Sequence, residues 1–287
     1  MSQSSRAVES GHLYVVATPI GNLGDLSPRA QAVLSAVDRI CAEDTRNSGR
    51  LLSHYGIRTP VTAVHEHNES NACASLVTAM QGGSAFALIS DAGTPLISDP
   101  GFVLVRAARA AGVPVITIPG PCAAIAALSV SGLPSDRFVF EGFLPGKSAA
   151  RRQRLQELHS ETRTLILYES SHRIADTARD LAELFGSRAV CLARELTKLH
   201  EQSITLPAAD LPGWIGADAN RERGEFVLLI EGAAENTAST QMDAERVLRL
   251  LLTELPVSSA AKLASEISGG RKKDLYELAL RLQRQSG

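Results

Sequence analysis

The sequence predicts an α/β fold whose first half forms a mostly parallel sheet, and three observations indicate it. Short apolar runs alternate with helix-like segments from Leu13 to Ile118, which is the pattern of strands joined by crossover helices. Several of these runs stop abruptly at Thr-Pro, Ser-Asp or Pro-Gly, as buried strands do where they open into loops. After Gly132-Leu133-Pro134 the strands follow one another with fewer helices, so we expect a second, α+β domain.

The elements of the first half follow from local signals. Ser27-Pro28 is typical of a helix N-cap followed by proline at the first helical position. Pro119-Gly120-Pro121 ends a strand and precedes an apolar helix of small residues over 122–131. We expect the other strands at 13–17, 39–42, 61–64, 86–90 and 113–118, and the other helices at 28–36, 48–55, 72–81 and 102–111.

The second half is expected to hold strands at 138–143, 164–168, 189–193 and 225–230. The composition becomes linker-like over 235–240, and three helices follow at 242–254, 258–267 and 272–283. The predicted domains are therefore an N-terminal α/β domain over 11–133, a second domain over 136–233 that completes a cleft, and a helical extension over 240–287.

Composition excludes several classes of protein. The chain has 287 residues, of which 44% are hydrophobic and 21% charged, as expected of a soluble globular protein. Its formal net charge of −2 gives no global basic field for nucleic acid, and 4% aromatic residues argue against a base-stacking platform. The polar N-terminus lacks the apolar region of a signal peptide and no run is long enough to span a membrane, so we expect a cytoplasmic protein. The four cysteines have no metal-binding spacing, and we expect free thiols and no metal.

The most informative segment is Ser90 to Gly101, which reads SDAGTPLISDPG and follows the apolar run 85–89. It marks the carboxyl edge of a parallel strand, where ligands bind in open α/β sheets. Thr18 to Leu26 (TPIGNLGDL) follows the first strand, but it has neither the dinucleotide glycine pattern nor the Gly-Lys-Ser/Thr of a phosphate loop. A tight turn explains its glycines about as well as a site does, and the charge of Asp25 favours a site.

Polar clusters also follow three other predicted strands: the segments 43–50, 168–173 and 194–198. Each also has an ordinary structural explanation: the first as a helix N-terminus, the second as a segment with a capping or surface histidine, and the third as an ion-paired surface segment. Arg46 fits the first explanation poorly, because a cation near a helix N-terminus needs an anion. Taken together, the clusters predict one cleft between the two domains.

Two segments are locally basic. Residues 147–154 (KSAARRQR) hold four basic residues and no acid, and residues 256–287 hold six Lys or Arg against three acids. A solvated helix start or flexible loop is the ordinary interpretation of the first. Two such patches could nevertheless straddle a nucleic-acid backbone.

Six motifs carry a family resemblance: TPIGNLGDLSPRA, AEDTRNSGRLL, SDAGTPLISDPG, PGPCAAIAAL, LILYESSHR and GEFVLLIEG. In this order they resemble the S-adenosylmethionine-dependent 2′-O-ribose methylases of bacterial small-subunit rRNA, which belong to the tetrapyrrole-methylase-like superfamily. The resemblance covers nearly the whole chain, including KKDLYELAL near its end. Cys122 departs from the family, which has serine there.

The resemblance implies a two-domain fold with S-adenosylmethionine in the inter-domain cleft, a homodimer, and a cytidine in the decoding region of 16S rRNA as target, on free rRNA or the 30S subunit. Within the motif SDAGTPLISDPG, the resemblance places the cofactor contacts around Asp91 and Thr94. We expect the end of this motif, Ser98 to Gly101, to shape the turn into the next helix. The implied cofactor residues are Asp91, Gly93, Thr94, Pro95, Cys122, Ala123, Tyr168, Glu225 and Phe226.

A poorly acidic 2′-hydroxyl needs a base or a cation beside it, and the candidates for this catalytic role are Asp25, Glu169 and Lys198. The candidate RNA-binding residues are Arg46, Arg50, Lys147, Arg151, Arg152, Arg173, Arg194, Arg271, Lys272 and Lys273. Two alternatives stay open: a methylase of small tetrapyrroles, which would not need the basic segments, and a non-catalytic RNA-binding factor of ribosome assembly.

Overall fold

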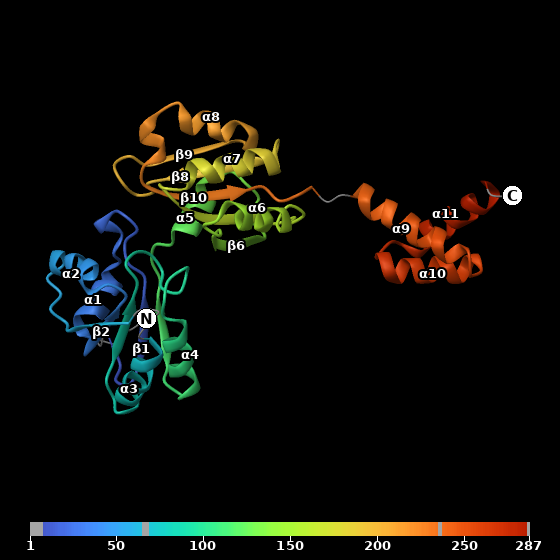
Figure 1. Ribbon diagram of the computed structural model, residues 1–287. Coiled ribbons are helices and arrows are strands. Elements are labelled where there is room, and N and C mark those ends of the chain that lie inside the picture. The colour runs from blue at the N-terminus through green and yellow to red at the C-terminus, as the bar shows by residue number, and fades with distance from the viewer. Residues whose placement is uncertain (1–7, 65–68, 235–236, 286–287) are drawn as a thin grey trace, which may run out of the picture. The chain divides into compact units, whose positions relative to one another are not determined.

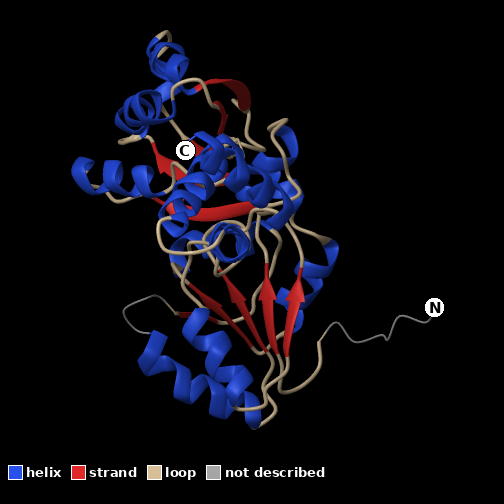
Figure 2. Cartoon of the chain, turned by 90° about the vertical axis from the view of Figure 1, so that its right-hand side faces the viewer, coloured by secondary structure: helices blue, strands red, loops and turns tan. Residues whose placement is uncertain are grey.

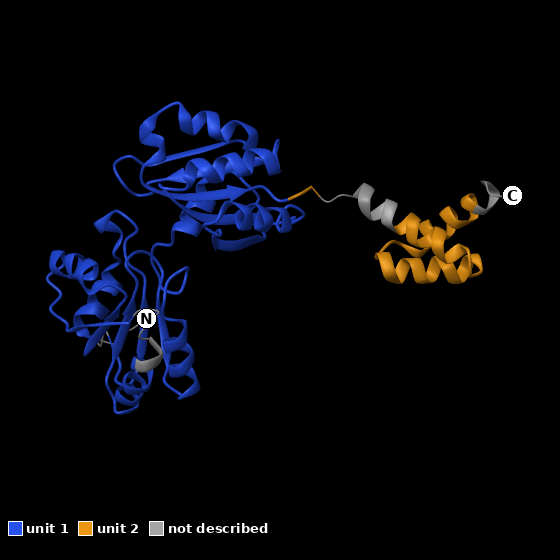
Figure 3. Cartoon of the chain, viewed as in Figure 1, with its two compact units in different colours: residues 1–232 blue, residues 233–287 orange. Residues whose placement is uncertain are grey.

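The computed structural model describes residues 8–64, 69–234 and 237–285, and the side chains of these residues except 69–71, 237–243 and 283–285. The chain divides into two compact units, Met1–Gly232 and Ala233–Gly287 (Figure 3). The first unit holds two sheets and their helices, and the second holds three helices.

The first sheet has five strands in the order β3-β2-β4-β1-β5, and every neighbouring pair is parallel. The arrowheads of its strands point the same way in Figure 2, as in a parallel sheet, and Figure 1 labels the elements along the chain. The strands are β1 (Leu13–Val16), β2 (Arg39–Ala42), β3 (Val61–Ala63), β4 (Phe86–Ile89) and β5 (Val115–Ile118). The helices are α1 (Pro28–Ala36), α2 (Thr45–His54), α3 (Glu69–Gln81) and α4 (Phe102–Ala110), and a 3₁₀ turn η1 (Leu23–Asp25) follows β1.

Both faces of this sheet are covered, which explains why its strands are apolar throughout. In β4, Ala87 and Ile89 pack with α1 and α2, whereas the alternate residues Phe86 and Leu88 pack with α3 and α4. Successive side chains of a strand point to opposite faces, so one short run serves two cores. The sequence prediction of a mostly parallel, helix-flanked sheet is confirmed.

The second sheet is mixed, in the order β6-β7-β10-β8-β9. Only the β6–β7 pair is parallel, and the three other pairs are antiparallel. The strands are β6 (Phe138–Phe143), β7 (Thr164–Ser170), β8 (Ala189–Arg194), β9 (Gln202–Pro207) and β10 (Glu225–Ile230). The helices are α5 (Ala123–Val130), α6 (Ser148–Glu157), α7 (Ile174–Phe185) and α8 (Leu211–Gly216), with 3₁₀ turns η2 (Ala208–Asp210) and η3 (Ala219–Glu222).

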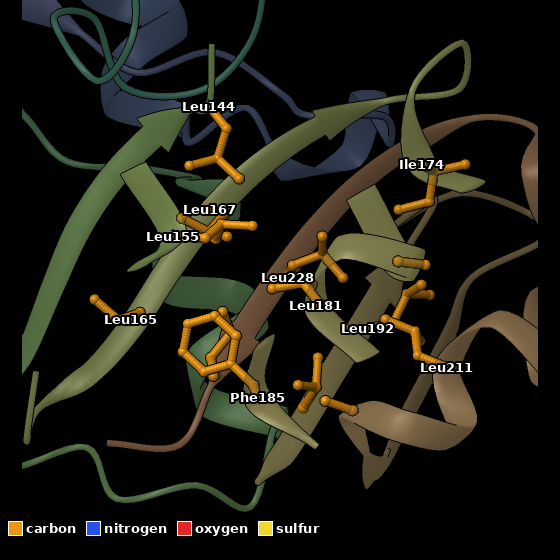
Figure 4. Close-up of a cluster of buried hydrophobic side chains, with 14 of the residues drawn as sticks. Leu144, Leu155, Leu165, Leu167, Ile174, Leu181, Phe185, Leu192, Leu211 and Leu228 are labelled. Carbon is orange, nitrogen blue, oxygen red and sulfur yellow. The ribbon is translucent and has the colours of Figure 1, made fainter. Parts of the chain in front are cut away.

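The two faces of the second sheet have different partners. One face packs on α6, α7 and α8 and forms the larger core, which includes Leu165, Leu181 and Leu228 (Figure 4). The other face packs on α5 and also on Ile20, which belongs to the loop after β1 of the first sheet. The loops of the first sheet therefore lie against the second sheet.

The second unit is a bundle of α9 (Thr237–Leu252), α10 (Val257–Ser268) and α11 (Lys272–Gln285). Leu248, Ala260, Ala264 and Ala279 are fully buried in its own core. Gly269 ends α10 in the left-handed conformation, with φ of 72°, which permits the tight turn into α11.

The structure differs from the predicted elements in several places. β5 begins at Val115 rather than 113, because Pro114 has no backbone N–H to donate to the ladder. α2 begins at Thr45 rather than 48, since the side chain of Asp44 caps it by accepting from the Arg46 backbone N–H.

The strands of the second half were expected to have fewer helices between them than those of the first, and no individual helix was predicted there. Residues 148–157 and 174–185 form α6 and α7, and β9 was not predicted. Only every second residue of β9 is partly buried, as is typical of an edge strand, so it lacks the apolar run by which the other strands were recognised. In the parts of the chain that are described, no helix has the length and apolar character needed to cross a membrane.

Candidate functional site

A cavity of about 440 Å³ lies between the loops of the first sheet and one face of the second sheet. Its walls come from the loops after β1, β4 and β5, from β6, β7, β8 and β10, and from the start of α5. Small-molecule sites of proteins have volumes of this order and are lined mostly by apolar side chains.

The loops after β1 and β4 are joined at the cavity. Thr18 and Gly93 form a two-way backbone bridge, with N···O distances of 2.8 and 3.0 Å. Gly93 has φ of +79°, and a Cβ there would lie 3.2 Å from the Ile20 side chain. Glycine is therefore needed both for the backbone conformation and for the approach of Ile20.

Strained backbone is concentrated on the two loops that border the cavity. The four non-glycine residues with positive φ in the described chain are Leu96 (75°), Ser98 (64°), Glu195 (50°) and Thr197 (67°). The first pair lies in the motif loop after β4 and the second pair in the loop after β8. Each such residue costs on the order of 1–3 kcal/mol and is retained where the surroundings hold it, which is common at ligand sites.

One part of the cavity wall is apolar. Ile20, Ala193, Leu196, Phe226 and Val227 line it, and all five are buried. A wall of this kind suits a flat heteroaromatic ring such as adenine.

Tyr168 lies between this wall and the start of α5. Its hydroxyl accepts a hydrogen bond from the backbone N–H of Ala124 at 3.1 Å, and its ring packs edge-on against Phe140 and Phe143. Burial raises the pKa of the Tyr168 hydroxyl, and the neighbouring Cys122 raises it further. Tyr168 is therefore a neutral positioning group and not a base.

Another part of the wall is acidic. Asp99 lines the cavity and is half-buried, and its burial raises its pKa, with the charge of Asp91 acting in the same direction. Burial also raises the pKa of Glu43, to which the charges of Asp99, Asp91 and Asp44 add. The field at this side of the cavity is negative and favours a cation.

Most of the cofactor residues expected from sequence line this one cavity, and two do not. The lining includes Gly93, Thr94, Cys122, Ala123, Tyr168, Glu225 and Phe226. Asp91 is turned toward the start of α2, where it accepts hydrogen bonds from the Asp44 backbone N–H at 3.2 Å and from Asn47 Nδ2 at 2.8 Å. Pro95 is buried and lies outside the lining.

Sequence reasoning missed several residues of the cavity. Ser98 and Asp99 were expected to shape the turn into α4, but both line the cavity. Gly101 does have that role, since it is the N-cap of α4 and a Cβ there would lie 2.7 Å from Leu88. The sequence signal that could have identified Asp99 is that it is the second aspartate of the motif. No such signal marks the apolar lining residues, because they resemble ordinary core residues: Ile20, Ile97, Phe143, Ala193 and Leu196.

The three catalytic candidates differ in their freedom to react. Glu169 is buried and accepts hydrogen bonds from Thr177 Oγ1 at 2.6 Å and the Ser170 backbone N–H at 2.8 Å. Burial alone would lower the pKa of Lys198, but its hydrogen bonds to Glu195 and Glu225 outweigh this and raise it, so Lys198 keeps its proton. Asp25 is exposed at the end of η1 and forms no ion pair with the described residues.

Two of the expected RNA contacts are corrected by the structure, and a third is partly engaged within the protein. Arg151 is 3% exposed and bound to Asp180, and Arg194 is 6% exposed and donates to the carbonyl oxygens of Arg223 and His200. Arg173 donates to the Leu144 carbonyl and pairs with Glu169. The Arg151 and Arg194 guanidinium groups hold the fold together and are not available to phosphates, whereas the Arg173 side chain is still 25% exposed.

The other basic candidates are accessible. Arg152 is partly exposed and paired with Asp180 and Glu183, so the segment 147–154 is not the acid-free patch that its sequence suggested. The exposed candidates are Arg46, Arg50 and Lys147 in the first unit and Arg271, Lys272 and Lys273 in the second. Within the described residues, no cluster of three or more His, Cys, Asp or Glu is arranged to hold a metal ion.

The cavity fits S-adenosylmethionine on its own chemistry. Its apolar wall suits adenine, and its acidic side suits a positive charge. A phosphate group would meet this acidic side instead of a basic cradle, which agrees with the missing phosphate motifs.

Comparison with known proteins agrees with the fold and the site. Residues 12–212 match the model of the Tetrapyrrole (Corrin/Porphyrin) Methylases, and residues 238–283 match that of the RsmI C-terminal HTH domain. The chain superposes with a TM-score of 0.51 on uroporphyrin-III C-methyl transferase from Thermus thermophilus complexed with S-adenyl homocysteine, at 16% identity over 77% of this chain and 97% of that one.

The fold and cavity thus define a methyltransferase of the tetrapyrrole methylase class. Two similar relatives, both named ribosomal RNA small subunit methyltransferase I, are from Xylella fastidiosa and Pseudomonas aeruginosa. The first is 57% identical over 93% of this chain and 98% of its own length, and the second 55% identical over 97% and 100%. The chain belongs to the ribosomal RNA small subunit methyltransferase I family, and the predictions of fold class, family and S-adenosylmethionine dependence are confirmed.

Proposed function

We propose that this protein transfers a methyl group from S-adenosylmethionine to the 2′-oxygen of a cytidine in the decoding region of 16S rRNA. The observation that carries the proposal is the cavity, in which an apolar slot and an acidic side meet at the carboxyl edge of a parallel sheet. The relatives support the proposal by their name and by their similarity to this chain over nearly its full length.

The residues of the chain would act mainly by positioning. When bound, S-adenosylmethionine supplies a methyl group activated by a cationic sulfur. Ile20, Leu196 and Phe226 would hold the adenine and exclude water, while the backbone at Thr94 would receive polar atoms of the cofactor. Alignment of the two reacting groups can contribute roughly 7–11 kcal/mol to lowering the barrier.

Asp25 is the remaining candidate for the proton acceptor. Glu169 has both oxygens engaged, and the raised pKa of Lys198 opposes a role as a base. Lys198 instead supports the loop that carries Asp25, since a Cβ on Gly21 would lie 2.5 Å from Lys198 Cγ. We infer that Asp25 accepts the hydroxyl proton and that Lys198 keeps this loop in place.

The proposal includes further assignments that rest on the family. The substrate is rRNA, presented free or within the 30S subunit, and the enzyme acts as a cytoplasmic homodimer. The domains 11–133, 136–233 and 240–287 would contribute the first wall of the cleft, its second wall and RNA binding, respectively. The candidate phosphate contacts of the first unit are the exposed residues Arg46, Arg50 and Lys147, together with the partly exposed, ion-paired Arg152.

Methyl transfer to three substrates tests the proposal. Purified protein would be given radiolabelled S-adenosylmethionine with unmodified 30S subunits, unmodified 16S rRNA, or a reduced tetrapyrrole, and digested RNA would be analysed for 2′-O-methylcytidine. We expect label in 2′-O-methylcytidine and Asp25→Asn to slow single-turnover transfer with little change in cofactor affinity. Label in the tetrapyrrole alone, or RNA binding without cofactor binding, would support the alternative functions instead.

A further inference from the structure

Three carboxylates line the cavity, and two of them already have partners in the protein. Glu169 is hydrogen-bonded to Thr177 and to the Ser170 backbone, and its Oε1 lies 3.3 Å from Arg173 Nε. Glu225 is 77% exposed and accepts a hydrogen bond from Lys198 Nζ at 2.8 Å. Glu169 is fully engaged, while Glu225 shares Lys198 with Glu195 and is screened by solvent.

Asp99 is the third carboxylate, and its surroundings are different. It is half-buried and forms no ion pair with any cationic side chain of the described residues. The groups that act on it are the nearby Ser90 hydroxyl, which favours its charged form and donates to the Ala92 carbonyl, and the like charge of Asp91. A partly buried carboxylate beside another acid is unfavourable unless a cation completes its environment.

The backbone around Asp99 is held in a costly conformation. Ser98, the residue before it, has φ of 64°, and Leu96 has φ of 75°. Gly142 in β6 makes room for this loop, because a Cβ there would lie 2.9 Å from Ser98 Oγ. The fold thus maintains strain that sets an unpaired carboxylate on the cavity wall, as functional sites often do.

We propose that Asp99 recognises the positive charge on the sulfur of S-adenosylmethionine, so that the enzyme distinguishes the methyl donor from its uncharged thioether product, S-adenosylhomocysteine. This inference rests on the proposed function. Donor and product share adenosine and the amino acid tail, and they differ by one methyl group and one charge. A carboxylate facing the sulfur therefore strengthens donor binding and favours release of the product once the charge is lost.

Calorimetric titration of both ligands into Asp99→Asn tests the proposal. The amide keeps the shape of the side chain, but it lacks the charge. A charge-assisted contact contributes about 1.5–3 kcal/mol, so the dissociation constant for S-adenosylmethionine should rise roughly tenfold or more. The constant for S-adenosylhomocysteine should change less than about threefold, since the neutral sulfur loses no ionic contact.

Glu43→Gln is the matched control, because Glu43 belongs to the same acidic group but does not line the cavity. It removes one negative charge nearby and should leave the ratio of the two dissociation constants within about twofold, since solvent screens charges that do not meet the ligand. Thermal unfolding should show Asp99→Asn to be no less stable than the wild type, because an unpaired, partly buried charge is removed.

Two results would overturn the inference: an unchanged ratio in Asp99→Asn, or equal weakening of both ligands, which would place the contact at the shared tail. If the wild-type protein does not bind S-adenosylmethionine, the proposed function fails instead, and the two failures are thereby distinguished.

Discussion

At the scale of single residues, Arg151 and Asp180 form an ion pair at 2.6 Å between α6 and α7, and both are almost fully buried. A buried charge that loses its partner retains the cost of its desolvation, which is why such pairs are sensitive to removal of one member. Arg152 also binds Asp180, so one carboxylate organises two neighbouring arginines.

We expect Asp180→Asn to lower the free energy of unfolding by roughly 3 kcal/mol or more, because Arg151 is left buried and unpaired. Chemical denaturation of the whole chain measures this change. Arg163→Gln is the control: Arg163 lowers the pKa of Glu161 to about 2, but both side chains are accessible and water screens the pair. The midpoint of Arg163→Gln should stay at the wild-type value, and equal effects of the two substitutions would contradict the argument.

The same residues show what a sequence can predict of a site and what it cannot. The motif glycines and Tyr168 were found because their neighbours in the sequence are unusual. Arg151, Arg173 and Arg194 were assigned to RNA because the acids and carbonyl groups that hold them come from segments far along the chain. Asp99 was placed in a turn, since its access to the cavity depends on the positive φ of Ser98.

At the scale of elements, β6 and the motif loop depend on each other at Gly142. The pairing of β6 with β7 shifts its register between Phe140 and Gly142, and Gly142 has φ of +71°. A bulge of this kind bends an edge strand and redirects its side chains. The six-residue apolar pattern predicted β6 correctly but could not reveal that its glycine admits Ser98.

We expect Gly142→Ala to weaken cofactor binding as well as the fold. The positive φ costs on the order of 1–2 kcal/mol for a residue with a Cβ, and the new methyl group would displace Ser98 and the loop that carries Asp99. Gly132→Ala is matched to it, because Gly132 also has φ of +71° but has open space around it. Both variants should lose similar stability in thermal unfolding, and only Gly142→Ala should raise the dissociation constant for S-adenosylmethionine; equal cofactor affinities would refute the coupling.

At the scale of the whole molecule, the cavity and the helical bundle belong to two units with separate cores. The first unit contains the complete lining of the cavity, and the second buries its own apolar face around Leu248 and Ala260. The helical extension and its basic character were predicted from sequence, since Lys272 and Lys273 stand together at the start of a periodic segment. Their exposure at the beginning of α11 agrees with a role in phosphate binding.

A chain that ends at Ala234 should therefore keep its affinity for S-adenosylmethionine and lose affinity for rRNA. Each phosphate contact contributes about 0.7–0.9 to the slope of log K against log salt concentration, so loss of Arg271, Lys272 and Lys273 should make the slope shallower by about 2. Binding of 16S rRNA at several salt concentrations gives this slope, and calorimetry with the cofactor shows that the first unit is intact. The triple variant Arg271→Gln, Lys272→Gln, Lys273→Gln in the full chain should reproduce the change in slope, because it removes the same charges while leaving the buried face of the bundle in place. If the truncated chain loses affinity at an unchanged slope, the second unit contributes through contacts other than phosphates.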